Sequence, residues 1–175
     1  MNVKYLLAAA AATTMLVTAS TAVLAGASGV PFKSAGFGTE TSLSASGCQF
    51  TAAGCTVESN GTAISSYMGT GPYVSTLTVD WAAATSNGDG GYCAPASGTQ
   101  GMISGANGDT LYQSETGTVC EVGASSLTAP HTFSGTFTIT GGTGRFAAAS
   151  GSGTVTGGDD GYGNSYYSET GTISF

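Results

Sequence analysis

Two glutamates occupy the same position in a pentapeptide that occurs twice, Ser-Glu-Thr-Gly-Thr, at Ser114–Thr118 and again at Ser168–Thr172. Both copies lie in stretches where apolar and polar residues alternate. If these stretches are β-strands, every second side chain points to the same face of the sheet. Glu115 and Glu169 then share their faces with mainly apolar residues. These neighbours are Leu111, Gln113, Gly117 and Val119 for Glu115, and Tyr167, Gly171, Ile173 and Phe175 for Glu169.

Two carboxyl groups on an apolar face could perform acid–base chemistry. Burial raises the pKa of a carboxyl group, and a second carboxylate nearby raises it further. Glu115 and Glu169 could then hold one neutral acid and one base at neutral pH, which suits proton transfer, isomerisation or cyclisation. A β-bulge at Gly117 or Gly171 would reverse the phase and place both acids in solvent. Positions at the mouth of the fold are a further alternative.

Short strands with a period of two must position these side chains. The alternation is clearest in His131–Thr140, where Phe and Ile fall on one face and Thr and Ser on the other. Thr76–Trp81, Thr110–Cys120 and Tyr166–Phe175 follow the same pattern. No stretch of ten residues after the first 25 has helical periodicity, and Phe146–Ala149 is too short for an isolated helix.

The pattern predicts an all-β fold of about eight strands. Turn-forming pairs at Asn60-Gly61, Asn87-Gly88 and Asn107-Gly108, and a loop at 157–161, separate the predicted strands. Few charges protect the edges of such a sheet, and closure into a barrel removes those edges. We therefore expect a closed antiparallel β-barrel of lipocalin-like architecture, with a two-sheet β-sandwich as the alternative.

The composition excludes several classes of protein. The 175 residues include 29 Gly, and charged residues make up only 7%, with 3 Lys and Arg against 10 Asp and Glu. So few cations exclude a nucleic-acid-binding surface or a basic membrane-binding patch. Arg145 alternates with Phe146, which indicates an outward position for its guanidinium group. No feature of the sequence indicates an oligomeric state.

The first 25 residues resemble a secretory signal peptide. Lys4 precedes a Leu-, Ala- and Val-rich stretch, and small residues follow at Val23-Leu24-Ala25. Several Thr and Ser residues interrupt the apolar run, and no basic cluster follows it, so we expect no integral membrane span once the peptide is removed. The prediction is a secreted protein with a single β-barrel domain over residues 26–175.

Four cysteines follow the signal peptide. An even number in an oxidising compartment indicates two disulfides, for which three pairings are possible. Pairing between neighbours, Cys48 with Cys55 and Cys93 with Cys120, is favoured because it needs only two adjacent hairpins. No Cys-x-x-Cys motif is present, so we predict neither a metal site nor a cofactor.

The segment Thr140–Thr154 contains a Gly-Gly-Thr-Gly turn, then Phe two residues later, then Ala and Gly. Gly141, Gly142 and Gly144 permit unusual backbone angles or close packing, and Phe146 then returns to the core. This segment resembles the signature turn of the allene oxide cyclase and dirigent superfamily, and small secreted bacterial proteins share it. Ala147 and Ser150 stand where plant dirigent members carry Arg.

The resemblance implies an eight-stranded antiparallel barrel whose internal cavity accepts an apolar small molecule. Plant members guide cyclisation or radical coupling, and bacterial relatives include cyclases. We therefore expect a secreted barrel that binds an apolar ligand in its lumen. Two alternatives remain, a cyclase or isomerase that uses Glu115 and Glu169, and a structural extracellular protein whose barrel is packed solid. The predicted ligand-binding side chains are Trp81, Phe133, Phe137 and Tyr167.

Overall fold

The structure, a computed structural model, describes residues 29–42, 54–103, 107–126 and 128–175. These residues form nine strands and two short 3-10 turns. In chain order the elements are β1 (Val30–Ser42), β2 (Cys55–Ser65), β3 (Gly69–Val79), η1 (Trp81–Ala83), β4 (Thr85–Ser86), β5 (Tyr92–Ile103), β6 (Thr110–Glu121), β7 (His131–Gly142), η2 (Gly144–Phe146), β8 (Ser150–Asp159) and β9 (Asn164–Ser174). The predicted signal peptide lies outside the described residues.

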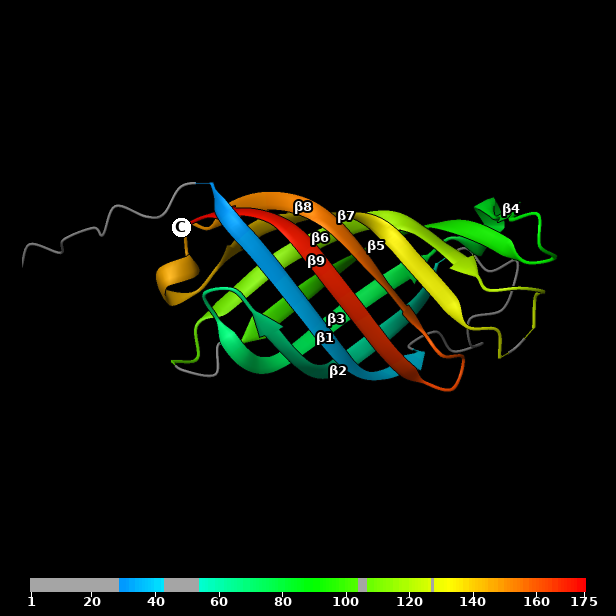
Figure 1. The fold of residues 1–175 in the computed structure, drawn as a ribbon, viewed down its shortest axis with the longest axis horizontal. Coiled ribbons are helices and arrows are strands. Elements are labelled where there is room, and N and C mark those ends of the chain that lie inside the picture. Colours follow the sequence, from blue (N-terminus) through cyan, green and yellow to red (C-terminus); the bar gives the residue numbers. More distant parts are fainter. Residues whose placement is uncertain (1–28, 43–53, 104–106, 127) are drawn as a thin grey trace, which may run out of the picture.

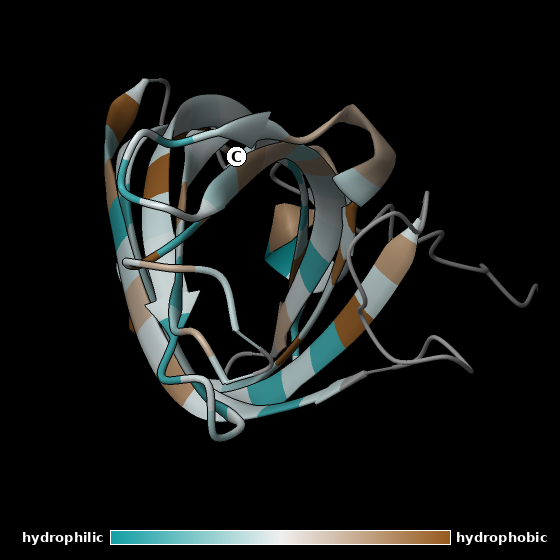
Figure 2. Ribbon diagram, turned by 90° about the vertical axis from the view of Figure 1, so that its right-hand side faces the viewer, coloured by the Kyte–Doolittle hydropathy of each residue, from teal (hydrophilic) through white to brown (hydrophobic). Residues whose placement is uncertain are grey.

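Eight of the strands close into an antiparallel barrel (Figures 1 and 2). Each strand pairs with its neighbour in the chain, and the ring is completed by pairing of β3 with β5 and of β1 with β9. The two-residue strand β4 pairs with the first two residues of β5, beside the ring. The predicted barrel is therefore confirmed, and the sandwich alternative is wrong. Among the described residues, no helix has the length and apolar character needed to span a membrane.

The barrel wall has a mainly apolar inner face and a hydroxyl-rich outer face. In β7, Phe133, Phe137 and Ile139 are buried, whereas every Thr and Ser that alternates with them is exposed. On the outer face, threonines of neighbouring strands form hydrogen bonds with one another. The hydroxyl oxygens of Thr56 and Thr78, for example, lie 2.9 Å apart. Such cross-strand pairs stabilise a sheet without charge.

The prediction of a hairpin turn at Asn60-Gly61 is wrong. Both residues lie inside β2, where Gly61 is paired with Gly38 of β1. A Cβ atom on Gly61 would lie 2.1 Å from the carbonyl oxygen of Phe37. Glycine is needed here for the close approach of two strands, which sequence alone does not distinguish from a turn. The Asn87-Gly88 and Asn107-Gly108 turns are confirmed, and both glycines have positive φ.

Two predicted boundaries also need correction. Strand β3 ends at Val79, and Trp81 begins the 3-10 turn η1 instead of continuing the strand. The side chain of Asp80 accepts a hydrogen bond from the Ala82 amide and so favours the turn. The predicted loop at 157–161 starts too early, because β8 continues to Asp159 and pairs with β7 and β9 over that length.

The glycine-rich turn after β7 seals one end of the barrel. Gly141 and Gly144 have φ of 128° and 54°, and a Cβ on Gly142 would lie 2.1 Å from the carbonyl oxygen of Thr110. The turn includes η2 and buries Phe146 completely in the core. Phe146 packs edge-on against Phe175, with ring centroids 5.3 Å apart. Arg145 is exposed, as predicted.

One disulfide fastens the wall near the opposite end. Cys93 of β5 and Cys120 of β6 face each other across the sheet and are bonded, as predicted. Cys48, the predicted partner of Cys55, lies outside the described residues.

Candidate functional site

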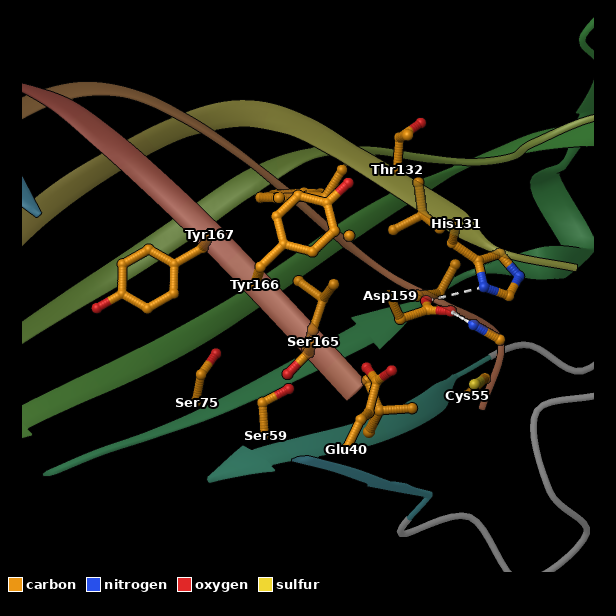
Figure 3. Close-up of a pocket in the computed structure, with 18 of the residues that line it drawn as sticks. Glu40, Cys55, Ser59, Ser75, His131, Thr132, Asp159, Ser165, Tyr166 and Tyr167 are labelled. Atoms are coloured by element: carbon orange, nitrogen blue, oxygen red, sulfur yellow. Dashed lines mark hydrogen bonds and ion pairs between the residues drawn. The ribbon is translucent and has the colours of Figure 1, made fainter. Parts of the chain in front are cut away.

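The opposite end of the barrel opens into a cavity of about 470 Å³. It runs inward from a rim formed by the ends of the strands, with Glu40, His131 and Asp159 at that rim (Figure 3). Apolar side chains line its walls, among them Leu77, Val79, Trp81, Val119, Phe133 and Val155. This is the size of a site for a small organic molecule.

Glu115 and Glu169 both point into the barrel. Only 7% of Glu115 and 2% of Glu169 is exposed. Strand pairing continues without interruption through Gly117 and Gly171, and the register shift between β6 and β7 falls earlier, at Tyr112 and Gln113. The solvent-exposed alternative is therefore wrong. Glu115 lines the cavity, and Glu169 lies behind that surface.

A polar network holds Glu169 in place. The Gln113 side-chain amide donates a hydrogen bond to the Glu169 carboxyl group. Tyr167, on the same strand as Glu169, accepts a hydrogen bond from the Gln100 side chain at 2.9 Å, and its hydroxyl lies 3.1 Å from the Ser34 hydroxyl. One carboxyl oxygen of Glu115 and one of Glu169 are buried with no hydrogen-bond partner.

Burial shifts the protonation of both acids. Removal from water raises the pKa of Glu115 to about 7. Burial, together with the nearby Glu115 charge, raises the pKa of Glu169 to about 8, against the opposing effect of hydrogen bonds from Gln113 and Ser34. Burial also raises the pKa of Tyr167. At neutral pH Glu169 is therefore mainly neutral, and Glu115 is poised between its two forms.

A second cluster of ionisable groups lies at the rim. The Nδ1 atom of His131 lies 2.9 Å from a carboxylate oxygen of Asp159, and the other oxygen accepts a hydrogen bond from the Gly161 amide at 2.8 Å (Figure 3). The imidazole is 5.9 Å from the Trp81 ring, measured between centroids. Glu121, only 3% exposed, accepts a hydrogen bond from the Tyr92 amide through one oxygen, and its other oxygen has no partner.

The rim groups shift one another's pKa values. Burial and the Asp159 charge raise the pKa of Glu40 to about 7, while His131 lowers it. For His131, burial is the largest single effect and lowers the pKa. The hydrogen bond and charge of Asp159, with the charges of Glu121 and Glu40, outweigh it, so the pKa of His131 is raised overall.

Three of the four predicted ligand-binding side chains line the cavity. These are Trp81, Phe133 and Tyr167. Phe137 does not. It is buried beside Glu115, its partner across β6 and β7, and packs against Phe32 with ring centroids 5.7 Å apart, so its assignment to the ligand site stays a prediction. The phase of β7 correctly predicted an inward Phe137, but phase cannot show where along the barrel the packed core gives way to the cavity.

Several polar residues of the cavity were missed in the sequence. Glu121 shares the face of Glu115 on β6, so period-two phase alone would have found it. Glu40 could have been found in the same way on β1. The pairing of His131 with Asp159 needs the register between β7 and β8 and has no signal within either strand.

The described part of the chain contains no group of three or more His, Cys, Asp and Glu side chains that could hold a metal ion. No protein family, curated protein or solved structure matches the chain. The case for a function therefore depends on the geometry of the cavity.

Proposed function

We propose that this protein is a secreted β-barrel that binds an apolar small molecule in the open end of its lumen. One observation supports the proposal above the others, the cavity of about 470 Å³ with apolar walls and a few polar groups at defined positions. A structural barrel packed solid would have no such space. Membership of the allene oxide cyclase and dirigent superfamily is compatible with this role and remains part of the proposal.

Trp81 provides a built-in reporter of binding. It is the single tryptophan of the chain and lies at the cavity wall. Phenylnaphthylamine, an uncharged apolar fluorophore, should accept excitation energy from Trp81 when it enters the lumen. We expect saturable energy transfer at equimolar stoichiometry.

Filling the cavity should abolish this signal. Val119→Phe adds bulk to the cavity wall, whereas Val74→Phe adds the same bulk on the outer face, where Val74 is 46% exposed. We expect V119F to lose binding and V74F to retain it. Equal binding by both variants would contradict the lumen as the site.

A second candidate function is proton-transfer catalysis, as in a cyclase or isomerase. It is favoured by the burial of Glu115 beside Glu169, with pKa values of about 7 and 8. The Glu115 carboxylate could remove a proton α to the carbonyl of a bound ketone, and a proton would return to the same carbon of the enolate. Exchange of the α-protons of β-tetralone in deuterated water, followed by NMR, tests this. Catalysis predicts acceleration by the wild type that Glu115→Gln removes, and an unaccelerated rate in the wild type would exclude this carbon acid as a substrate.

A further inference from the structure

The acidic groups of the lumen outnumber its basic side chains. Four carboxyl groups line the cavity, from Glu40, Glu115, Glu121 and Asp159, against one imidazole. Among the described residues that line it, none is Lys or Arg. Lys33 and Arg145 are both exposed. His131 is paired with Asp159 and also interacts with the charges of Glu40 and Glu121, whereas no cation in the described part of the chain acts on Glu115.

Unsatisfied acceptor atoms point to a ligand that donates hydrogen bonds. Glu115 and Glu121 are more than nine-tenths buried, both line the cavity, and each has a buried carboxyl oxygen without a partner. A buried acceptor without a donor costs about 1–3 kcal/mol, and more when it is charged. A donor supplied by the ligand would remove that cost.

Space for such a donor exists beside Glu115. Glu115 itself lines the cavity, so a donor in the cavity can reach its carboxyl group. Its neighbour on β5, Gly98, carries no side chain, whereas Phe137 faces it from β7 and the ring of Phe133 lies over Gly117. Toward the rim the cavity walls are apolar, with Val119 and Phe133 adjacent along β6 and β7.

We propose that the ligand is an amphiphilic organic cation, an apolar ring or chain that carries a protonated amine. This proposal rests on the proposed function of lumen binding. The ammonium group binds Glu115 at the inner part of the cavity, and the apolar portion lies against Val119, Phe133 and Trp81. Glu40, Glu121 and Asp159 at the rim attract the cation toward the entrance.

A matched set of naphthalenes tests the charge preference. Naphthylethylamine, ethylnaphthalene and naphthylacetate share a ring and differ in charge, and each can be measured by displacement of phenylnaphthylamine. At neutral to mildly alkaline pH we expect naphthylethylamine to bind about tenfold or more tightly than ethylnaphthalene, and naphthylacetate to bind most weakly. Equal or stronger binding of the carboxylate would overturn the proposal.

Glu115→Gln preserves shape and removes the charge. It should weaken naphthylethylamine binding by about 10- to 100-fold, as expected for loss of a charge-assisted hydrogen bond, and leave ethylnaphthalene unchanged. Glu58→Gln makes the same substitution on the outward phase of β2, opposite to cavity-lining Val57 and Ser59, and should change neither affinity. Retained ethylnaphthalene binding also shows that E115Q is folded. Unchanged amine affinity in E115Q would contradict the assignment.

The pH dependence of the wild type provides a test without any variant. Glu115 and Glu40 both have pKa values near 7, so raising the pH from about 5.5 to about 8.5 makes the cavity more negative while the amine stays protonated. Deprotonation of His131 acts in the same direction. The ionisable groups that line this space are Glu40 on β1, Tyr73 on β3, Glu115 and Glu121 on β6, His131 on β7, Asp159 on β8, and Tyr166 and Tyr167 on β9. Glu169 lies behind Glu115 and carries no charge of its own until the pH approaches its pKa of about 8.

We expect amine affinity to rise with pH relative to that of ethylnaphthalene, and a flat or falling ratio would refute the proposal. If ethylnaphthalene binds but the amine shows no preference, only the cation proposal fails. If phenylnaphthylamine itself does not bind, the proposal of lumen binding fails together with the cation proposal.

Discussion

Glu169→Gln should stabilise the protein at alkaline pH and leave its stability at acidic pH unchanged. The folded protein binds the Glu169 proton more tightly than the unfolded chain does, with a pKa of about 8 against 4.5. Glu169 therefore destabilises the fold progressively as the pH rises through the window between these values. Glutamine has nearly the same shape, still accepts the hydrogen bond from Gln113 and never ionises.

The size of the effect follows from the two pKa values. Each tenfold difference in proton affinity corresponds to about 1.4 kcal/mol. At pH 8 ionisation of Glu169 therefore lowers the free energy of unfolding of the wild type by about 4 kcal/mol, and E169Q avoids this loss. At pH 4.5 and below, both carry a neutral side chain and should differ little. Glu115 and Glu40, with pKa values of about 7, add to the alkaline loss of the wild type.

Urea unfolding at a series of pH values measures this directly. The free energy of unfolding of the wild type should fall between about pH 5 and pH 8, and that of E169Q should fall less. E58Q is the matched control and should follow the wild type. Coincident curves for E169Q and the wild type at pH 8, or a wild type that gains stability with rising pH, would refute the buried neutral carboxyl group.

Three further predictions concern the barrel wall and its seal. Cys93→Ser with Cys120→Ser should lower the free energy of unfolding by about 3 to 4 kcal/mol, because the bond closes a loop with a sequence separation of 27, and an unchanged urea midpoint would contradict a stabilising role. Gly61→Ala should lower the free energy of unfolding by at least about 2 kcal/mol, because its Cβ would lie 2.1 Å from a carbonyl oxygen. In the matched Gly101→Ala the nearest atom is 3.6 Å from the new Cβ, so the free energy of unfolding should change by no more than about 0.5 kcal/mol. Phe146→Ala should lower the free energy of unfolding by about 3–5 kcal/mol, and a loss below 1 kcal/mol would show that this ring does not seal the barrel.

Period-two phase predicted much of the fold and part of the site. It correctly turned Phe133, Phe137 and the two predicted glutamates inward, because alternation within one strand depends only on the local backbone. The glycine-rich turn before Phe146 was also readable, since positive φ at Gly141 and Gly144 restricts the residue type.

The remaining features depend on distances between strands, which no single strand encodes. Gly61 resembled a turn residue because close strand approach and positive φ both select glycine. The pairing of His131 with Asp159 and the division between sealed core and open cavity are set by register and by which rings fill the lumen. Phase gives the direction of a side chain and not its depth, so it could not show that Phe137 lies outside the lining of the cavity.

A crystal structure of the protein grown with saturating naphthylethylamine would test lumen binding most directly. We expect the naphthalene ring inside the open end, against Val119 and Phe133, with its amine within hydrogen-bonding distance of Glu115. An unoccupied lumen, or a lumen closed by collapsed side chains in crystals where the amine is bound only outside the barrel, would contradict the binding role.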